Sequence, residues 1–410
     1  MANLLFLVHR LPYPPNKGDK VRSFHLLKHL TAEHKVFLAT FVDDPADAVH
    51  LPMLRRLCED VCAVPLAPRS AKLRSLTGLA NGQPLTLCYY DNARLRDWVR
   101  QTVARRQIDR VLVFSSSMAQ YTEAKWALPT LIDLVDVDSA KWTDYAAAHA
   151  WPLSWLYARE GERLLAYERA VVARSQHAFL VTQKEVDLFV RLAPECAAKV
   201  TALGNGVDAD FFAPRPDRPS PFTAGELPLV FTGAMDYWPN IDAVTWFTQD
   251  VLPTLRARWP ALRFHIVGRN PSVAVRALAS EAVAVTGTVA DVRPYLQHAA
   301  AVVAPLRLAR GVQNKVLEAM AMARPVVAAG ACVEAIDARP GRDILVADHT
   351  SAFLEQLATL FDAPAQALAV GRAGRRCVLD HYSWPAQLAH LDQTMTTIST
   401  SARLQAVAAP

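Results

Sequence analysis

The sequence predicts an α/β protein with two doubly wound parallel sheets, on the basis of three observations. Short apolar, β-rich runs alternate with longer helical patterns along nearly all of the 410 residues, as in consecutive βαβ units. A proline-rich segment without periodicity divides these runs into two series. In both series, polar and glycine-containing motifs come directly after strands, at the sheet edge where ligands bind in this class of fold.

Eleven strands are predicted, six before the break and five after it. They are 3–9, 36–42, 61–65, 111–114, 131–135 and 178–182, then 229–232, 263–267, 283–286, 301–304 and 325–329. Helical patterns lie between most of them, for example at 19–31, 93–106 and 158–175.

These elements predict four parts of the chain. We expect an N-terminal domain over 1–212, a linker with five prolines over 213–228, a C-terminal domain over 229–380 and a last helix over 381–400. The last helix is expected to cross back onto the N-terminal domain, because no strand follows it. We expect the carboxyl ends of the two sheets to face each other across a cleft.

Composition excludes several classes of protein. The chain is 52% hydrophobic and 20% charged, which is not the composition of a disordered protein. It has no apolar run long enough for a membrane-spanning helix, and MANLLFLVHR reads as a strand and not as a signal peptide. We therefore expect a cytoplasmic protein.

The charge and the cysteines suggest neither a nucleic-acid partner nor a metal. The net charge of +5 is too small for a nucleic-acid-binding protein. An ordinary solvated surface is enough to explain it, and the alternative is peripheral association with the inner face of an anionic membrane. No second cysteine pair follows Cys58 and Cys62, so no zinc site is expected.

The loop after the first strand is a candidate anion site. In PYPPNKGDKVR, Gly18 opens a helix whose amides can meet an anion, and Lys17, Lys20 and Arg22 can reach a phosphate. The alternative is an ordinary solvated loop. Neither G-x-G-x-x-G nor G-x4-G-K-[ST] is present, so a dinucleotide site or a nucleoside-triphosphate loop is unsupported.

Three aspartates alternate in the run LIDLVDVDS after the fifth strand. Alternation places Asp133, Asp136 and Asp138 on one side of an extended segment, with the last two at its open end. There a carboxylate can act as general base or bind a sugar hydroxyl, and Asp136 is the first choice. An Asp-rich turn that caps the next helix is an alternative, as is a D-x-D metal site, which the two-domain architecture disfavours.

The second half repeats the pattern of a strand followed by glycine. Gly233 and Asn240 lie in GAMDYWPN, between a strand and a helix, and Gly268 with Arg269 follows the next strand. Each of these motifs is weak alone, because glycine is common in loops after strands.

The strongest segment is 302–329, where a strand ends at Pro305 and a helix begins near Gln313. A diphosphate can sit on the amides of Gly311 and Val312 at this helix start. Lys315 and Arg307 can add charge-assisted hydrogen bonds. Glu318, on the same helix, can accept two ribose hydroxyls, or can be an exposed helix carboxylate.

Taken in order, these segments resemble the GT-B glycosyltransferases of the family 4 type. The motifs are PYPPNKGDKVR, G-N-G-V-D-x-x-x-F at 204–212, G-x-M-x-x-x-P-N at 233–240, V-G-R-N at 267–270, G-x-V-x-D at 287–291 and G-V-Q-N-K-V-L-E-A-M-A at 311–321. They span nearly the whole chain. DLVDVDS-x-KW further resembles the branch found beside exosortase and PEP-CTERM sorting systems, which implies a role in exopolysaccharide assembly.

The resemblance implies a retaining hexosyltransferase that moves a sugar from a UDP- or GDP-type donor to a glycan or lipid-linked acceptor. The N-terminal domain would bind the acceptor and the C-terminal domain the donor. No metal or other cofactor would be needed, because basic side chains and helix amides stabilise the leaving diphosphate. Glu318 matches the ribose ligand of the family.

The sequence departs from the family pattern at three places. Arg310 stands where many relatives carry a glutamate, GAMDYWPN lacks the usual Arg and Lys, and Asp136 aligns with a histidine. The phosphate charge would then be met by Arg307, Arg269 and Lys315. A nucleotide-sugar epimerase of the same architecture and a non-catalytic nucleotide or glycan binder remain alternatives.

Overall fold

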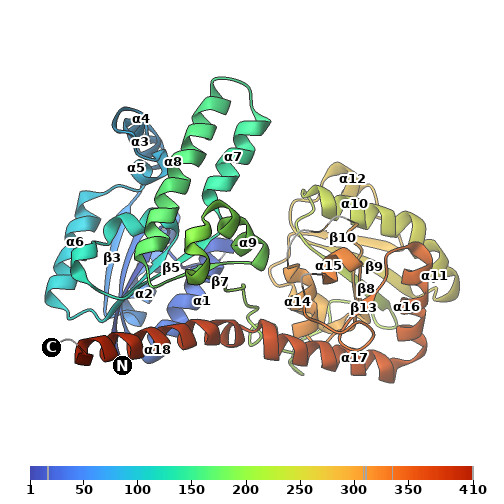
Figure 1. Ribbon diagram of the computed structural model, residues 1–410. Helices are drawn as coiled ribbons and strands as arrows, with labels where there is room; N and C mark the ends of the chain where they lie inside the picture. The colour runs from blue at the N-terminus through green and yellow to red at the C-terminus, as the bar shows by residue number, and fades with distance from the viewer. Residues whose placement is uncertain (16–17, 308, 310–311, 335, 409–410) are drawn as a thin grey trace. The chain divides into compact units, whose positions relative to one another are not determined.

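The computed structural model describes residues 1–15, 18–307, 309, 312–334 and 336–408. The chain forms two compact units, one of residues 1–205 and 387–410, the other of residues 206–386. Figure 1 shows an α/β arrangement in each. The chain enters the second unit ahead of the predicted linker, and residues 213–226 carry no helix or strand.

Unit 1 is built on a seven-stranded parallel sheet with the order β3-β2-β1-β4-β5-β6-β7. The strands are β1 (Asn3–Val8), β2 (Lys35–Val42), β3 (Asp60–Pro65), β4 (Arg110–Phe114), β5 (Thr130–Val135), β6 (His177–Leu180) and β7 (Val200–Ala202). The central strands are apolar and almost entirely buried, as expected of a parallel sheet covered on both faces. The direction of crossover reverses between β1 and β4, where ligands bind in such sheets.

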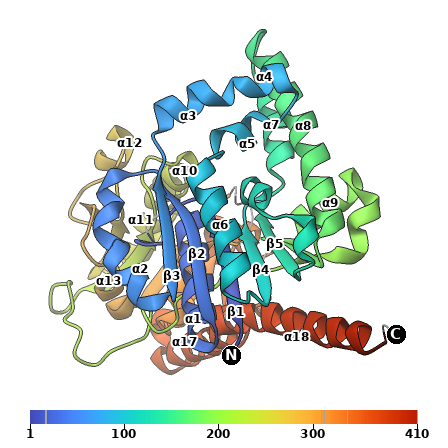
Figure 2. The ribbon, with the colours of Figure 1, turned by 90° about the vertical axis from the view of Figure 1, so that its left-hand side faces the viewer.

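Helices cover both faces of this sheet (Figure 2). They are α1 (Gly18–Glu33), α2 (Leu51–Leu57), α3 (Pro68–Ser75), α4 (Thr77–Asn81), α5 (Leu85–Tyr89), α6 (Ala93–Arg105), α7 (Asp138–Ala148), α8 (Leu153–Arg174) and α9 (Gln183–Leu192). The 3₁₀ turns are η1 (Pro45–His50), η2 (Ser116–Tyr121), η3 (Ala124–Trp126) and η4 (Pro194–Lys199).

Helices α7 and α8 form a hairpin that projects from the sheet beside α3, α4 and α5 (Figure 1). The close packing of the two helices depends on Gly161 of α8. A Cβ at this position would lie 2.7 Å from the Thr143 hydroxyl and 3.0 Å from the carbonyl oxygen of Ser139, closer than side chains tolerate.

Helix α18 (Trp384–Ala408) belongs to unit 1 from Gln387 onward. His29 Nε2 lies 2.9 Å from both carboxylate oxygens of Asp392, and the His390 ring lies 3.0 Å from the Thr201 hydroxyl. These contacts fasten the last helix to α1 and β7.

Unit 2 has a six-stranded parallel sheet with the order β10-β9-β8-β11-β12-β13. Its strands are β8 (Leu227–Thr232), β9 (Leu262–Val267), β10 (Val283–Gly287), β11 (Ala301–Ala304), β12 (Val326–Ala328) and β13 (Leu345–Val346). The helices are α10 (Trp238–Trp246), α11 (Leu252–Arg258), α12 (Val273–Arg276), α13 (Arg293–His298), α14 (Asn314–Ala321), α15 (Gly330–Val333), α16 (Thr350–Asp362) and α17 (Pro364–Cys377), with π turns η5 (Phe247–Val251) and η6 (Val378–Tyr382).

The predicted fold class, two parallel α/β sheets, is confirmed. Each of the eleven predicted strands is present. The two missed strands, β7 and β13, have three and two residues, too few to show a pattern in the sequence. No helix in the described part of the chain combines the length and apolar character needed to cross a membrane.

Candidate functional site

The strand ends of unit 2 bring together four of the predicted donor-binding residues. Gly233 follows β8 and Gly268 follows β9, and these two backbones nearly touch: a Cβ on Gly268 would lie 1.6 Å from the carbonyl oxygen of Gly233. A Cβ on Gly233 would lie 2.8 Å from the Asn240 amide nitrogen and 3.5 Å from Lys315 Nζ. Both glycines are therefore required sterically, which leaves room for the polar side chains beside them.

Lys315 is held in this cluster by an uncharged partner. Its ammonium donates a hydrogen bond to the buried Asn240 side-chain oxygen and lies 4.7 Å from the centre of the Phe231 ring. The Asn240 amide nitrogen in turn donates to the carbonyl oxygen of Ala234, at 2.8 Å. The amide orients the ammonium without neutralising its charge.

Burial shifts the titration of two side chains on the same face of α14. Desolvation lowers the pKa of Lys315 from 10.5 to about 8. One turn further on, desolvation raises the pKa of Glu318 from 4.5 to about 7, against the opposing charge of Lys315. A cation and a carboxylate with such shifts are typical of a functional site.

The remaining predicted donor ligands have different surroundings. Arg307 is exposed, and its guanidinium binds both carboxylate oxygens of Asp242 on α10. Arg269 is exposed after β9. Gln313 is the N-cap residue of α14, and Val312 packs against the core of unit 2. Gly311 and Arg310 lie outside the described residues.

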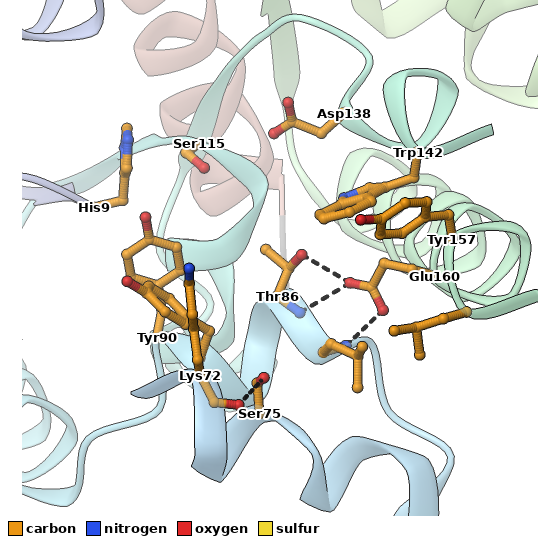
Figure 3. Close-up of a pocket in the computed structure, with 13 residues that line it drawn as sticks. His9, Lys72, Ser75, Thr86, Tyr90, Ser115, Asp138, Trp142, Tyr157 and Glu160 are labelled. Atoms are coloured by element: carbon orange, nitrogen blue, oxygen red, sulfur yellow. Dashed lines mark hydrogen bonds between the residues drawn. The ribbon is translucent and has the colours of Figure 1, made fainter. Parts of the chain in front are cut away.

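A pocket of about 430 Å³ lies in unit 1, at the carboxyl ends of its central strands. His9 follows β1, Ser115 follows β4 and Asp138 follows β5, so the pocket is at the point where the sheet reverses its direction of crossover. Figure 3 shows these polar groups together with aromatic side chains. The lining residues are His9, Lys72, Ser75, Leu85, Thr86, Tyr89, Tyr90, Ser115, Asp138, Trp142, Leu156, Tyr157 and Glu160.

The walls of this pocket are tied together by Glu160 of α8. Its carboxylate accepts hydrogen bonds from the Leu85 amide at 2.7 Å and from the amide and hydroxyl of Thr86 at 2.9 and 2.7 Å (Figure 3). These donors begin α5, so one buried carboxylate joins α5 to the hairpin. Aromatic rings next to polar groups, as here, suit a ligand with both apolar faces and hydroxyls.

The predicted extended run of three aspartates is interrupted in the structure. Strand β5 ends at Val135, which has a φ of +70°, and Asp138 is the first residue of α7. Asp133 is buried in the strand, whereas Asp136 and Asp138 accept hydrogen bonds from Lys141 at 2.7 and 3.1 Å. The expectation of one extended, one-sided segment was wrong. Asp133 and Asp136 are three residues apart and would lie on opposite sides even of a continuous strand, and the strand ends at Val135, before Asp136. Asp138 is the member of the pair that lines the pocket.

His9 is a candidate that sequence reasoning missed. Its ring stacks on Phe114 at a centroid distance of 5.7 Å, and its Nε2 lies 3.4 Å from the Asp19 carboxylate. Burial would raise the Asp19 pKa, but hydrogen bonding to His9 and the charge of Arg10 hold it well below its usual value. His9 directly follows the first strand, so its position at a strand end was the available signal.

The structure gives the predicted cations of α1 internal partners. Lys20 pairs with the Asp47 carboxylate, and Arg22 binds Asp133 through two hydrogen bonds of 2.7 and 3.1 Å. Both cations are 1% exposed, so these charges stabilise unit 1 instead of facing a ligand. Gly18 begins α1, but Asp19 in its first turn already supplies the negative charge that this helix end favours. Lys17 lies outside the described residues.

Comparisons with known proteins agree with this architecture. Residues 226–363, which include the whole sheet of unit 2, match a family model described as "Glycosyl transferases group 1". No match is found among curated proteins.

Several solved structures resemble this chain in fold. HepE from Anabaena, crystallised with UDP, is 15% identical with a TM-score of 0.61, and the alignment covers 97% of this chain and 100% of HepE. The sucrose-phosphate synthase of Thermosynechococcus elongatus is 17% identical with a TM-score of 0.61, covering 98% and 100%. WaaG, a glycosyltransferase of lipopolysaccharide biosynthesis, is 18% identical with a TM-score of 0.56, covering 95% and 99%. The chain therefore has the GT-B fold, and its second unit matches the group 1 glycosyltransferase model.

Proposed function

We propose that this protein is a retaining glycosyltransferase that uses a nucleotide-diphosphate sugar. The observation that carries the proposal is the cluster of Gly233, Gly268, Asn240 and Lys315 at the strand ends of unit 2, inside the segment that matches the glycosyltransferase model. HepE, which has the same fold, has been crystallised with UDP and with UDP-glucose. A hexosyl donor of the UDP or GDP type is the proposed substrate.

In the proposed donor site, α14 and the cluster provide complementary contacts. The Lys315 ammonium meets the diphosphate, and the amides that begin α14 meet its oxygens. Glu318 accepts hydrogen bonds from the ribose hydroxyls. Because Asn240 holds Lys315 without bringing an opposing charge, the ammonium can interact with the leaving diphosphate as that group gains negative charge.

In the proposed acceptor site, the pocket of unit 1 holds a glycan or lipid-linked acceptor. Trp142 and Tyr157, whose ring centres are 5.4 Å apart, offer apolar faces to a sugar ring. During transfer the bond between the anomeric carbon and the diphosphate oxygen breaks, and an acceptor oxygen bonds to that carbon on the same face. The proton of the acceptor hydroxyl goes to the departing phosphate or to a general base of the protein. The candidate bases are the carboxylates of Asp138 and Asp136, and the alternative is the imidazole of His9.

We propose that no metal takes part in this reaction. The Asp136 and Asp138 carboxylates share the Lys141 ammonium, which reduces the negative charge that a divalent ion would require. Turnover is expected to survive EDTA. Loss of turnover with EDTA and its return with manganese would instead assign these aspartates to a metal.

The proposed biological role is exopolysaccharide assembly, in the branch associated with exosortase and PEP-CTERM systems. The motif DLVDVDS-x-KW supports this placement. The proposed location is the cytoplasm, with peripheral association at the inner face of the membrane.

The decisive experiment has a binding stage and a product stage. Calorimetric titration with UDP and GDP should show that one of them binds, and that Lys315→Met weakens this binding whereas exposed Lys184→Met, on α9, does not. Radiolabelled nucleotide sugar with candidate acceptors should then give a transferred sugar. An isomerised nucleotide sugar would identify an epimerase, and binding without any product would identify a non-catalytic binder.

A further inference from the structure

Two neighbouring segments of unit 1 expose an unusual concentration of apolar side chains. From the start of α3 to the end of α4, Leu73 is 71% exposed, and Leu76 and Leu79 follow at intervals of three residues. At the tip of the α7–α8 hairpin, Trp151 is 80% and Trp155 is 56% exposed, and Tyr145 and Leu153 are exposed as well. Side chains of this size usually pack inside a protein, so their gathering at one place indicates a surface that contacts something else.

The two segments belong to one surface. The Arg159 guanidinium of α8 donates a 2.6 Å hydrogen bond to the carbonyl oxygen of Gly78 in α4. Lys72 and Ser75 of α3 line the same pocket as Leu156 and Tyr157 of α8. Figures 1 and 2 both place α3 and α4 beside the hairpin. We call the exposed side chains of these segments, together with Arg69 and Lys72, the apolar–basic face.

The charges of this face are mainly positive, although the exposed Asp144 directly precedes Tyr145. Residues 61–90 and 145–159 contain Arg69, Lys72, Arg74 and Arg159 and no aspartate or glutamate. Arg69 and Lys72 are exposed. Arg74 donates to the carbonyl oxygens of Cys88 and Tyr89, at 3.2 and 2.9 Å, and so secures α3 to α5. Exposed leucine and tryptophan side chains, interspersed with cations that outnumber the neighbouring carboxylate of Asp144, are complementary to an anionic lipid surface.

We propose that the apolar–basic face docks on a bilayer leaflet that carries anionic headgroups. Trp151 and Trp155 enter the headgroup region, as amphipathic aromatic side chains do. Leu73, Leu76 and Leu79 insert beside them, and Arg69 and Lys72 contact the headgroups. The pocket in unit 1 is walled by the same helices, so docking brings its lining close to the lipid surface. This inference rests on the peripheral membrane association proposed above and names the surface and the lipid chemistry that would mediate it. Because vesicle binding is measured without any sugar donor, its failure can be distinguished from a failure of the proposed transfer reaction.

The experiment measures binding of the full chain to vesicles by co-sedimentation. Vesicles of phosphatidylcholine alone are compared with vesicles that also contain phosphatidylglycerol. We expect binding to the anionic vesicles that weakens as salt is added. Replacement of both tryptophans by serine, Trp151→Ser with Trp155→Ser, should weaken binding by at least about tenfold. Arg69→Gln should weaken it by about fivefold.

Matched controls come from exposed side chains elsewhere. Val273→Ser with Leu368→Ser removes two exposed apolar groups of unit 2, at 76% and 52% exposure, and Lys184→Gln removes an exposed cation of α9. These variants should bind vesicles as the wild type does. Circular dichroism and the midpoint of thermal unfolding check that every variant is folded.

Three outcomes would overturn the proposal. The first is no binding to anionic vesicles at low salt, and the second is equal binding by the tryptophan variant and the wild type. The third is a concentration-dependent dimer that the tryptophan variant disperses while neither protein binds vesicles, which would assign the face to self-association. Nucleotide titration of the same samples separates these failures from a failure of the proposed transfer function.

Discussion

The buried cations of the two units differ in the partners that hold them. In unit 1, Arg22 is bound by the carboxylate of Asp133. In unit 2, Lys315 is bound by the amide of Asn240. A carboxylate cancels the charge and makes the cation part of the fold, whereas an amide fixes its position and leaves the charge free to act on a ligand. The chemistry of the partner, and not burial alone, thus separates a structural cation from a candidate binding cation.

Two aspartates of unit 1, Asp133 and Asp138, differ in how far they are exposed and in whether their ion pair is buried. Asp133 is 1% exposed and paired, whereas Asp138 lines the pocket and shares a half-exposed lysine. The ion pair between Asp138 and Lys141 is exposed. It can be replaced by contacts with a ligand at little cost in folding free energy, because surface ion pairs contribute little to stability. Asp138, which lines the pocket, is therefore our first choice for a carboxylate that engages a substrate, and Asp136, which does not line it, is the second.

The largest expected effect concerns Asp138. Asp138→Asn should keep nucleotide binding and lower turnover by about 10²–10⁴, the usual contribution of a general base. Asp136 lies two residues before Asp138 and does not line the pocket, so Asp136→Asn is the matched variant and should lower turnover less. Steady-state rates and nucleotide titrations decide between them. If Asp138→Asn has normal turnover and Asp136→Asn is inactive, Asp136 is the base, as the sequence analysis expected. If His9→Asn is the only inactive variant of the three, the base is His9.

Breaking the ion pair of unit 1 should affect stability and not nucleotide affinity. Arg22→Met leaves Asp133 as an unpaired buried carboxylate and should lower the free energy of unfolding by about 3–5 kcal/mol. Chemical denaturation measures this loss. Arg22→Met with Asp133→Leu removes both charges and should recover most of it. If Arg22→Met has wild-type stability, the structural role assigned to Arg22 is wrong.

Among the described residues, none forms an ion pair with the buried carboxyl group of Glu168. It accepts a 2.6 Å hydrogen bond from the Ser139 hydroxyl, and burial raises its pKa from 4.5 to about 8. Between those two values the unfolded chain is ionised while the folded carboxyl keeps its proton, so stability should fall as pH rises through this window.

The test of Glu168 is the pH dependence of unfolding. Glu168→Gln should match the wild type near pH 5 and should be more stable above pH 8, by an amount on the order of a few kcal/mol. Denaturation midpoints across this range measure the difference. Parallel pH curves for the two proteins would show that the carboxyl is ionised in the fold.

Replacing the two proposed nucleotide ligands of unit 2 should have the opposite effect to Arg22→Met: nucleotide affinity should fall while stability is kept. Lys315→Met and Glu318→Gln should fold normally, and each should weaken binding of the nucleoside diphosphate by about tenfold to a hundredfold, since hydrogen bonds to charged groups contribute about 1.5–3 kcal/mol. Calorimetric titration gives the affinities. If Glu318→Gln folds and binds the nucleoside diphosphate as tightly as the wild type does, Glu318 does not bind the ribose.

The smallest expected effect is the pH profile of nucleotide binding. Lys315 loses its charge above about pH 8, and Glu318 gains a proton below about pH 7, so affinity should be highest between these values. On the alkaline side the loss should not exceed about tenfold per pH unit. Lys315→Met should remove the alkaline limb and leave the acidic one. A flat wild-type profile would show that neither group titrates on binding.

The alternation of apolar runs with helical patterns was enough to predict the two parallel sheets, because buried parallel strands must be continuously apolar. The glycines at 233 and 268 could also be found from sequence, since a strand followed by glycine marks a close approach of backbones. Strands as short as β13 could not be found, because two residues carry no periodicity.

The tertiary structure decided which partner each buried cation has and on which element Asp138 lies. Lys20, Arg22 and Lys315 are all cations that follow strands in the sequence, but the first two meet carboxylates from distant segments and the third meets an amide. The turn at Val135 likewise sends Asp138 onto a helix. The sequence by itself determined which elements form and which of their ends carry polar groups, because both depend on local pattern. Which of those groups remain available to a ligand depends on contacts between residues far apart in the chain, such as the 111 positions between Arg22 and Asp133, and no local pattern specifies these.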